Sequence, residues 1–397
     1  MTNDIRQRIN DSYTTEHYTR LLDELKSRIG EVPDFRVAES PVFVPADLTQ
    51  KLKLACEEIC AQLLTPDYLE ASLQAVPAHQ SVPGCSEFPE LLVLDFGITH
   101  TSDGQLHPML IELQGFPSLY AYQSVLAQSY QKIWGLTPTD GTPYLSGFTH
   151  EKYVGYLQKL ICGTHAPQHV VLLEIDPRHQ KTRADFYASE RMFGISICCL
   201  RDIHRSGREL YHKKDGQLLP IHRIYNRIIF DELEQRPEFI REWNLLDPIE
   251  AEWVSHPNWY FRLSKFSLPF LKSRFVPESQ LLSQINQMPG QLSEWVLKPL
   301  YSFAGSGVQV DVTPDLLEHI EHPEHYLLQR KVQYEPVVNS PSGGVKVEIR
   351  MMIFIDPKSR RPQIITNLAR FSRGKLIGVR YNEGLDWVGG SSAFFME

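Results

Sequence analysis

The stretch WVLKPLYSFAGSGV, Trp295 to Val308, decides the fold expected for this chain. It places Lys298 on an apolar strand, directly before a turn of small residues that contains Gly305 and Gly307. Glycine tolerates positive φ and allows close approach of the backbone, so successive N–H groups of such a turn can bind phosphate beside the charged lysine. Taken alone, the stretch is equally compatible with a β-hairpin whose turn is rich in glycine and serine.

Two later stretches extend this pattern. Tyr326–Gln333 is a short apolar strand that runs into polar residues, which is typical of a hinge whose main chain faces an adenine. The strand predicted over Val345–Asp356 alternates, so that one face carries Lys346, Glu348 and Arg350. A charged strand face is also common on solvated sheet surfaces, so the interpretation depends on the neighbouring motifs.

The order of lysine strand, small-residue loop, hinge and arginine strand resembles an ATP-grasp domain that begins near Lys265. The resemblance implies that ATP is bound by Lys265, Lys298, Ala304, Gly305, Ser306, Gly307, Gln329 and Lys331. It also implies that Arg350 and Lys298 are catalytic. Asn367 and Arg370, on a following strand, are expected near the acceptor or a phosphate.

Carboxylates end two apolar strands much earlier in the chain. Asp95 closes the first, and the second carries Glu112 and Gln114, with a turn predicted over residues 101–106. Residues two apart on a strand point to the same side, so this pair can share an ion with Asp95 from the neighbouring strand. Oxygen ligands of this kind suit magnesium. The sequence therefore predicts a Mg²⁺ site formed by Asp95, Glu112 and Gln114.

The acidic hairpin precedes the lysine loop, and no Glu-x-Asn pair follows the loop on a strand. This order resembles the circularly permuted ATP-grasp family, which includes the synthetase part of glutathionylspermidine synthetase. The chain departs from that family in having Gln114 in place of asparagine and Val93 in place of an arginine before Asp95. The fold class implied is α/β (α+β): a circularly permuted ATP-grasp fold with a small parallel-sheet α/β lobe and a helical N-terminal region.

Three parts are expected along the chain. Residues 1–147 form a helical region, with helices over 12–29, 47–64 and 120–134, plus the acidic hairpin. Residues 148–260 form a small α/β substrate lobe, in which a strand, a helix and a second strand over 169–200 predict a parallel β-α-β unit, followed by one strand over 218–230. Residues 261–397 form the nucleotide-binding lobes.

Ligands of parallel sheets bind beyond the carboxyl ends of the strands. In the small α/β lobe that edge is predicted to carry Asp176, Asn226 and Arg227. We expect these side chains to meet a substrate.

Composition excludes several classes of function. The 397 residues carry a formal net charge of −8, which argues against a nucleic-acid partner. The sequence has no apolar run long enough to span a membrane and begins with polar residues, so neither a membrane protein nor a signal peptide is expected, and the predicted location is cytoplasmic. Six cysteines without zinc spacing predict reduced structural thiols.

These motifs together predict an ATP- and Mg²⁺-dependent ligase that joins a small-molecule or peptide carboxylate to an amine through an acyl phosphate. The same motifs are compatible with a kinase that phosphorylates a small molecule, because only the acceptor pocket differs. They are also compatible with a nucleotide-binding protein without turnover, and with an interaction protein that binds no nucleotide.

Overall fold

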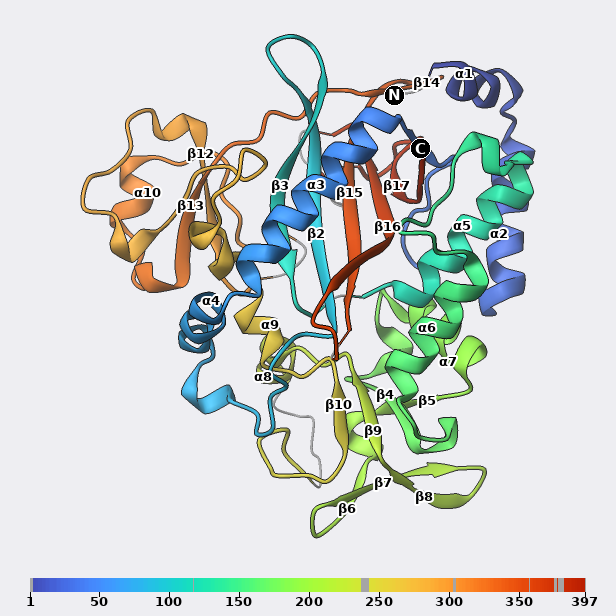
Figure 1. Ribbon diagram of the computed structural model, residues 1–397, viewed down its shortest axis with the longest axis vertical. Helices are drawn as coiled ribbons and strands as arrows, with labels where there is room; N and C mark the ends of the chain where they lie inside the picture. The colour runs from blue at the N-terminus through green and yellow to red at the C-terminus, as the bar shows by residue number, and fades with distance from the viewer. Residues whose placement is uncertain are drawn as a thin grey trace.

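An antiparallel sheet runs through the centre of the computed structural model, which describes residues 3–116, 118–236, 243–302, 305–356, 358–374, 377 and 382–396 (Figure 1). In spatial order its strands are β17 (Gly389–Ser391), β16 (Pro362–Ser372), β15 (Gly343–Ile355), β2 (Leu91–His100) and β3 (Leu106–Gln114), and β14 (Val338–Ser340) pairs beside β15. The predicted acidic hairpin β2–β3 therefore lies directly against the predicted arginine strand.

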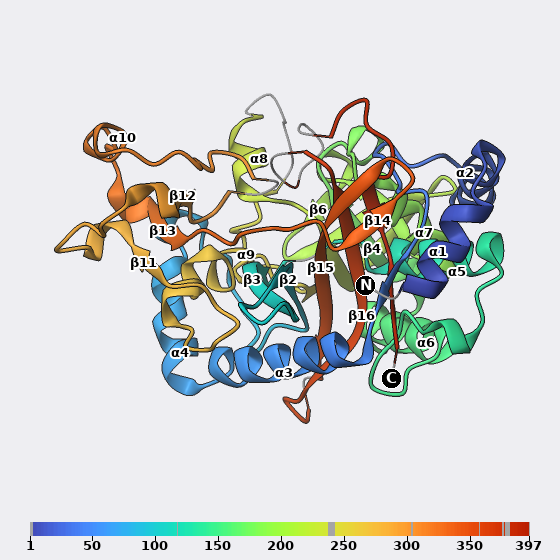
Figure 2. The same cartoon turned by 90° about the horizontal axis from the view of Figure 1, so that it is seen from above.

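Helix α3 (Ala46–Leu63) crosses one face of this sheet (Figures 1 and 2). Its apolar residues recur at helical spacing and are fully buried: Leu48, Leu52, Ala55, Cys56, Ile59, Cys60 and Leu63. Each buried leucine contributes roughly 1.5–3 kcal/mol relative to an exposed one. Because α3 covers this face, the charged side chains of β2, β3 and β15 gather on the opposite face.

The two ends of the chain meet at one edge of the molecule. Strand β1 (Val42–Val44) pairs in parallel with β18 (Ala393–Phe395), and Asn367 of β16 holds β18 by accepting from the Ala393 N–H at 2.6 Å. The helices beside this edge are α1 (Asn3–Ser12), α2 (Thr15–Ile29), α5 (Tyr120–Trp134) and α6 (His150–Cys162). The side chain of Asn367 is thus used to hold β18 and is not directed at an acceptor substrate or a phosphate, as the sequence suggested.

The predicted parallel sheet is confirmed. It has the order β10 (Glu252–Val254), β9 (Arg223–Asn226), β4 (Val170–Glu174) and β5 (Ser196–Cys199), with all pairs parallel. Helix α7 (Arg183–Phe193) connects β4 to β5 and packs against α5. A short helix, α8 (Phe230–Glu234), lies between β9 and β10 in the chain, and a second, α9 (Trp259–Arg262), follows β10.

The single strand predicted over residues 218–230 is wrong. The structure forms two strands in two sheets: β8 (Gln217–Ile221) closes an antiparallel sheet with β6 (His204–Ser206) and β7 (Glu209–Lys214), whereas β9 joins the parallel sheet. The turn between β7 and β8 is Asp215-Gly216, with φ of 50° and 81°. An Asp-Gly pair between two short strands is a strong hairpin signal that the sequence analysis missed.

A third lobe projects from the side of the central sheet (orange in Figure 1). Its strands have the order β11 (Ser279–Leu281), β13 (Tyr326–Arg330) and β12 (Trp295–Pro299), and α10 (Pro314–Glu318) lies beside them. This lobe has a small core of its own, formed by Leu282, Trp295, Leu297, Val312 and Leu328. Helix α4 (Pro66–Ala71) follows α3 near the base of the lobe.

All six cysteines are free thiols, and five of them are buried. Burial raises the pKa of the Cys60 thiol to about 12, which suits the expected structural role. Within the described ranges, no helix combines the length and apolar character needed to cross a membrane.

Candidate functional site

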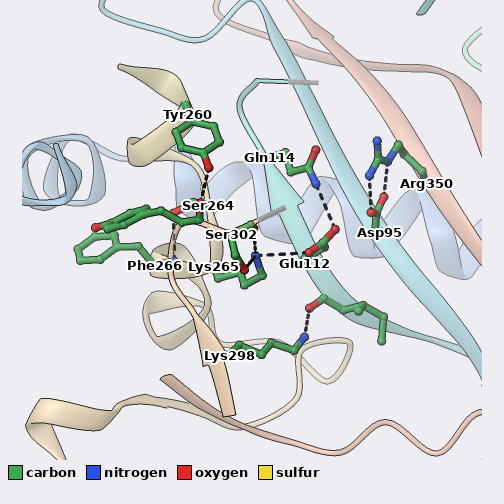
Figure 3. A network of polar contacts seen from close by, with 12 residues as sticks. Asp95, Glu112, Gln114, Tyr260, Ser264, Lys265, Phe266, Lys298, Ser302 and Arg350 are labelled. Carbon is green, nitrogen blue, oxygen red and sulfur yellow. Dashed lines mark hydrogen bonds and ion pairs between the residues drawn. The ribbon is translucent and has the colours of Figure 1, made fainter. Parts of the chain in front are cut away.

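The acidic hairpin brings the predicted metal ligands together. Asp95 on β2 lies directly opposite Glu112 on β3. Gln114, two residues further along β3, donates from Nε2 to Glu112 Oε1 at 3.1 Å, so these two side chains share one side of the strand as expected (Figure 3). Glu112 retains 16% side-chain exposure and is accessible to a ligand.

Both carboxylate oxygens of Asp95 accept hydrogen bonds from arginine side chains. Arg350, its register partner on β15, donates from Nε and Nη2 to the two carboxylate oxygens at 2.6 and 2.7 Å (Figure 3). Arg370 of β16 adds a contact of 2.5 Å. Burial disfavours the charge on Asp95, but both arginines outweigh burial and hold its pKa below the usual value. Asp95 therefore orients Arg350 and has no free oxygen for a metal.

Glu348 of β15 extends this network of charged side chains. Arg370 also pairs with Glu348 at 2.6 Å, and the Tyr334 hydroxyl donates to the other oxygen of Glu348 at 2.9 Å. Burial raises the pKa of Glu348. The ring of Tyr334 lies on Gly97, where a Cβ would come within 2.6 Å of it. Tyr334 is part of the site and had no signal in the sequence pattern.

Both predicted lysines approach the acidic hairpin. Lys298 of β12 donates to the carbonyl of Ile111 at 2.9 Å, although the two residues are 187 positions apart. Lys265 lies 3.8 Å from Glu112 Oε2 and donates to the carbonyl of Ser302. Both lysines are more than nine-tenths buried. Burial lowers the pKa of Lys298 to about 8, against an opposing effect of Glu112.

The described part of the small-residue loop has the positive φ values expected of its glycines. Gly305 and Gly307 have φ of 73° and 72°, and Leu297 and Gln309 exchange two hydrogen bonds of 2.9 Å, so the loop returns along β12 as a hairpin. Gly305, Ser306 and Gly307 are exposed. Ala304, the first loop residue assigned to phosphate, lies outside the described residues.

The predicted hinge is strand β13, paired on both edges. Gln329 is buried, and its Nε2 has no hydrogen-bond partner within the described part of the chain. It shares a face with Leu327, whose side chain joins the main core and not the core of the third lobe. Lys331 is used differently from the expectation, because its N–H donates to the Glu294 carbonyl at 2.7 Å and its amine to the Ser293 carbonyl.

The carboxyl edge of the parallel sheet gathers the three residues predicted there. Asp176 has a positive φ of 49° and lies 2.9 Å from His179. Asn226 is fully buried, and its Nδ2 lacks a partner among the described residues. The guanidinium of Arg227 lies 4.8 Å above the ring of Phe116, which follows Glu112 and Gln114 in the chain. The edge thus lies close to the acidic hairpin.

Two buried acids at this edge escaped the sequence analysis. Glu174 ends β4, and burial raises its pKa far above the usual value. Asp185 of α7 accepts from the N–H groups of Leu119 and Tyr122 at 3.0 and 2.9 Å, and so anchors the start of α5. The strand-ending position of Glu174 was a readable signal, whereas the role of Asp185 depends on how α7 packs against α5.

No group of three or more histidine, cysteine, aspartate or glutamate side chains lies close enough to hold a metal, as far as the structure describes the chain. Glu112 carries the carboxylate oxygens that magnesium prefers, whereas Gln114 turns its amide nitrogen toward Glu112 and becomes an oxygen ligand only when that amide is turned over.

Comparisons with known proteins bear on the fold. No protein-family model matches the chain, and no curated protein sequence matches it. Among solved structures, the chain is similar to a glutathione synthetase-like effector from Globodera pallida in its apo form. The TM-score is 0.60 at 10% identity, over 100% of this chain and 98% of the other. The chain therefore has a mixed α/β, glutathione synthetase-like fold.

Proposed function

We propose that this protein is an ATP- and Mg²⁺-dependent ligase that joins a carboxylate to an amine through an acyl phosphate. The observation that carries the proposal is the convergence of two buried lysines, Lys265 and Lys298, on the strand that bears Glu112 and Gln114. The glutathione synthetase-like fold supports an ATP-grasp site. The order of acids before lysine loop supports the circularly permuted form.

In this proposal the two lysines bind the triphosphate together with the N–H groups of Gly305, Ser306 and Gly307. The buried Nε2 of Gln329, which has no partner among the described residues, lies on the β13 face that points away from the small core, where it can meet the base. Glu112, with Gln114 once its amide is turned over, would hold Mg²⁺, which would supply positive charge beside the phosphates.

The chain's own cations then assist two displacements. A carboxylate oxygen of the substrate attacks the γ-phosphorus and ADP leaves; the amine next attacks the acyl carbon and phosphate leaves. Arg350 uses Nε and Nη2 on Asp95, so its remaining Nη1 edge can stabilise charge on the transferred phosphoryl group. Such a preorganised cation contributes on the order of 3 kcal/mol. Asp176, Asn226 and Arg227 border the acceptor substrates.

Hydroxylamine trapping tests the reaction class. Wild-type protein, ATP, Mg²⁺ and a pool of small carboxylates are expected to give hydroxamates, because hydroxylamine attacks an acyl phosphate but not a phosphate ester. Mass spectrometry identifies the hydroxamate and therefore the carboxylate. Reactions without ATP serve as the control. A stable phosphate ester without hydroxamate would establish the kinase instead, and ATP binding without either product would establish a protein without turnover.

A separate experiment tests whether Glu112 binds magnesium. Replacing Glu112 by glutamine keeps the shape but removes the charge, so the apparent affinity for Mg²⁺ in the hydroxamate reaction should fall by about tenfold or more. Glu335→Gln is the matched control, because Glu335 pairs with His100 of the same hairpin at the surface. Equal Mg²⁺ dependence of the Glu112 variant and the wild type would remove Glu112 from the metal site.

A further inference from the structure

Tyr260 of α9 points its hydroxyl toward the segment that leads into the small-residue loop (Figure 3). Its hydroxyl donates to the carbonyl of Tyr301, at the base of the loop, and lies 3.2 Å from a carboxylate oxygen of Asp231. Its ring packs edge-on against Phe116, with centroids 6.2 Å apart. The side chain of Tyr260 therefore contacts three segments: α8, the turn that follows Gln114, and the base of the loop.

A second hydrogen bond holds the next residue, Ser302. Lys265 donates to the carbonyl of Ser302, and the ring of Phe261 packs edge-on against Tyr301 at 5.3 Å. Two successive carbonyls are thus held by side chains from residues 260–265. In a trans peptide the carbonyl and the following N–H point in opposite directions, so holding the Tyr301 carbonyl fixes the direction of the Ser302 N–H.

Asp231 competes for the same hydroxyl. A tyrosine hydroxyl has a single hydrogen, so it cannot donate to Tyr301 and to Asp231 at once. Burial raises the pKa of Asp231, although Tyr260 and Lys265 oppose this and Glu234 adds to it. The contact of the hydroxyl with the Tyr301 carbonyl is the shorter of the two, so the single hydrogen is assigned to the loop.

Resting on the proposed function, we propose that Tyr260 is a positioning residue, which fixes the base of the loop through the Tyr301 carbonyl and so orders the loop amides for phosphate. Phe116 connects this residue to the acceptor edge, because its ring contacts Tyr260 and also lies 4.8 Å from the guanidinium of Arg227. Tyr260 touches no proposed substrate and acts only through the loop.

The test compares Tyr260→Phe with Tyr153→Phe. The first keeps the aromatic packing and removes the hydroxyl. The second removes a hydroxyl that donates to the Tyr120 carbonyl at 2.7 Å, in the core between α5 and α6. In nucleotide-free protein, amide hydrogen exchange at Val308 and Gln309, whose N–H groups donate to the Gly305 and Leu297 carbonyls, should rise about three- to tenfold in Tyr260→Phe and stay unchanged in Tyr153→Phe.

Affinity for a fluorescent ATP analogue with Mg²⁺ provides the second measurement. It should weaken about three- to tenfold in Tyr260→Phe alone, even where Tyr153→Phe is the less stable protein. Unchanged loop exchange, or faster exchange with unchanged affinity, would overturn the positioning role. If wild-type protein binds no nucleotide, the proposed function fails and the phosphate-ordering role of Tyr260 is overturned with it, whereas faster loop exchange would still establish the anchor itself.

Discussion

Replacing Arg350 by alanine should lower the free energy of unfolding by about 3 kcal/mol or more, because it removes the bidentate partner of a fully buried carboxylate. Arg370 still contacts Asp95 but is shared with Glu348, so it compensates only in part. Urea unfolding followed by circular dichroism measures the loss. Any effect of this variant on the proposed reaction is compared with wild type after correction for its unfolded fraction.

Two comparisons isolate the buried charge. Arg360→Ala breaks an exposed pair with Glu87 of similar length, 2.9 Å, and should change the unfolding free energy by less than about 1 kcal/mol. The double variant Asp95→Leu with Arg350→Met leaves no unpaired carboxylate in the core and should be more stable than Arg350→Ala. Equal losses in Arg350→Ala and Arg360→Ala would contradict the role assigned to the buried pair.

Affinity for Mg-ATP should fall as the pH rises above about 8, by up to about tenfold per pH unit. Burial lowers the pKa of Lys298 to about 8, so the free protein loses above that pH the proton that the phosphate complex requires. Lys298→Ala should weaken binding by roughly tenfold to hundredfold at pH 7. Isothermal titration calorimetry across pH 6.5 to 9.5 measures both effects.

Lys298→Arg is the matched variant, because a guanidinium keeps its charge over the whole range and should abolish the pH dependence. The nucleotide-free protein shows the opposite sign. The pKa of Lys298 is about 8 in the folded state and 10.5 in the unfolded state, so the folded state binds this proton less tightly. The contribution of Lys298 to the free energy of unfolding therefore increases between about pH 8 and 10.5. Wild-type affinity that is constant from pH 7 to 9.5 would contradict the placement of Lys298 against phosphate.

Local pattern was enough for the faces and bounds of many elements. The helix predicted over residues 120–134 has those bounds, and the β-α-β unit over 169–200 forms a parallel sheet. Two-residue periodicity placed Glu112 and Gln114 on one side of β3. The small-residue loop follows Lys298 with positive φ at both glycines. Each of these features depends on residues within about one turn or one strand of each other, which a single sequence records directly.

Partners across the sheet were decided only by the tertiary structure. The sequence pattern predicted that Asp95 binds a metal. The order of strands instead places it beside Arg350, 255 positions away, which donates hydrogen bonds to both of its carboxylate oxygens. Tyr334 and Tyr260 entered the site because two connecting segments cross from one lobe to another. Periodicity states which face a side chain occupies, but strand order depends on which long-range pairing buries the most apolar surface and satisfies the most charges, and no local window contains that information.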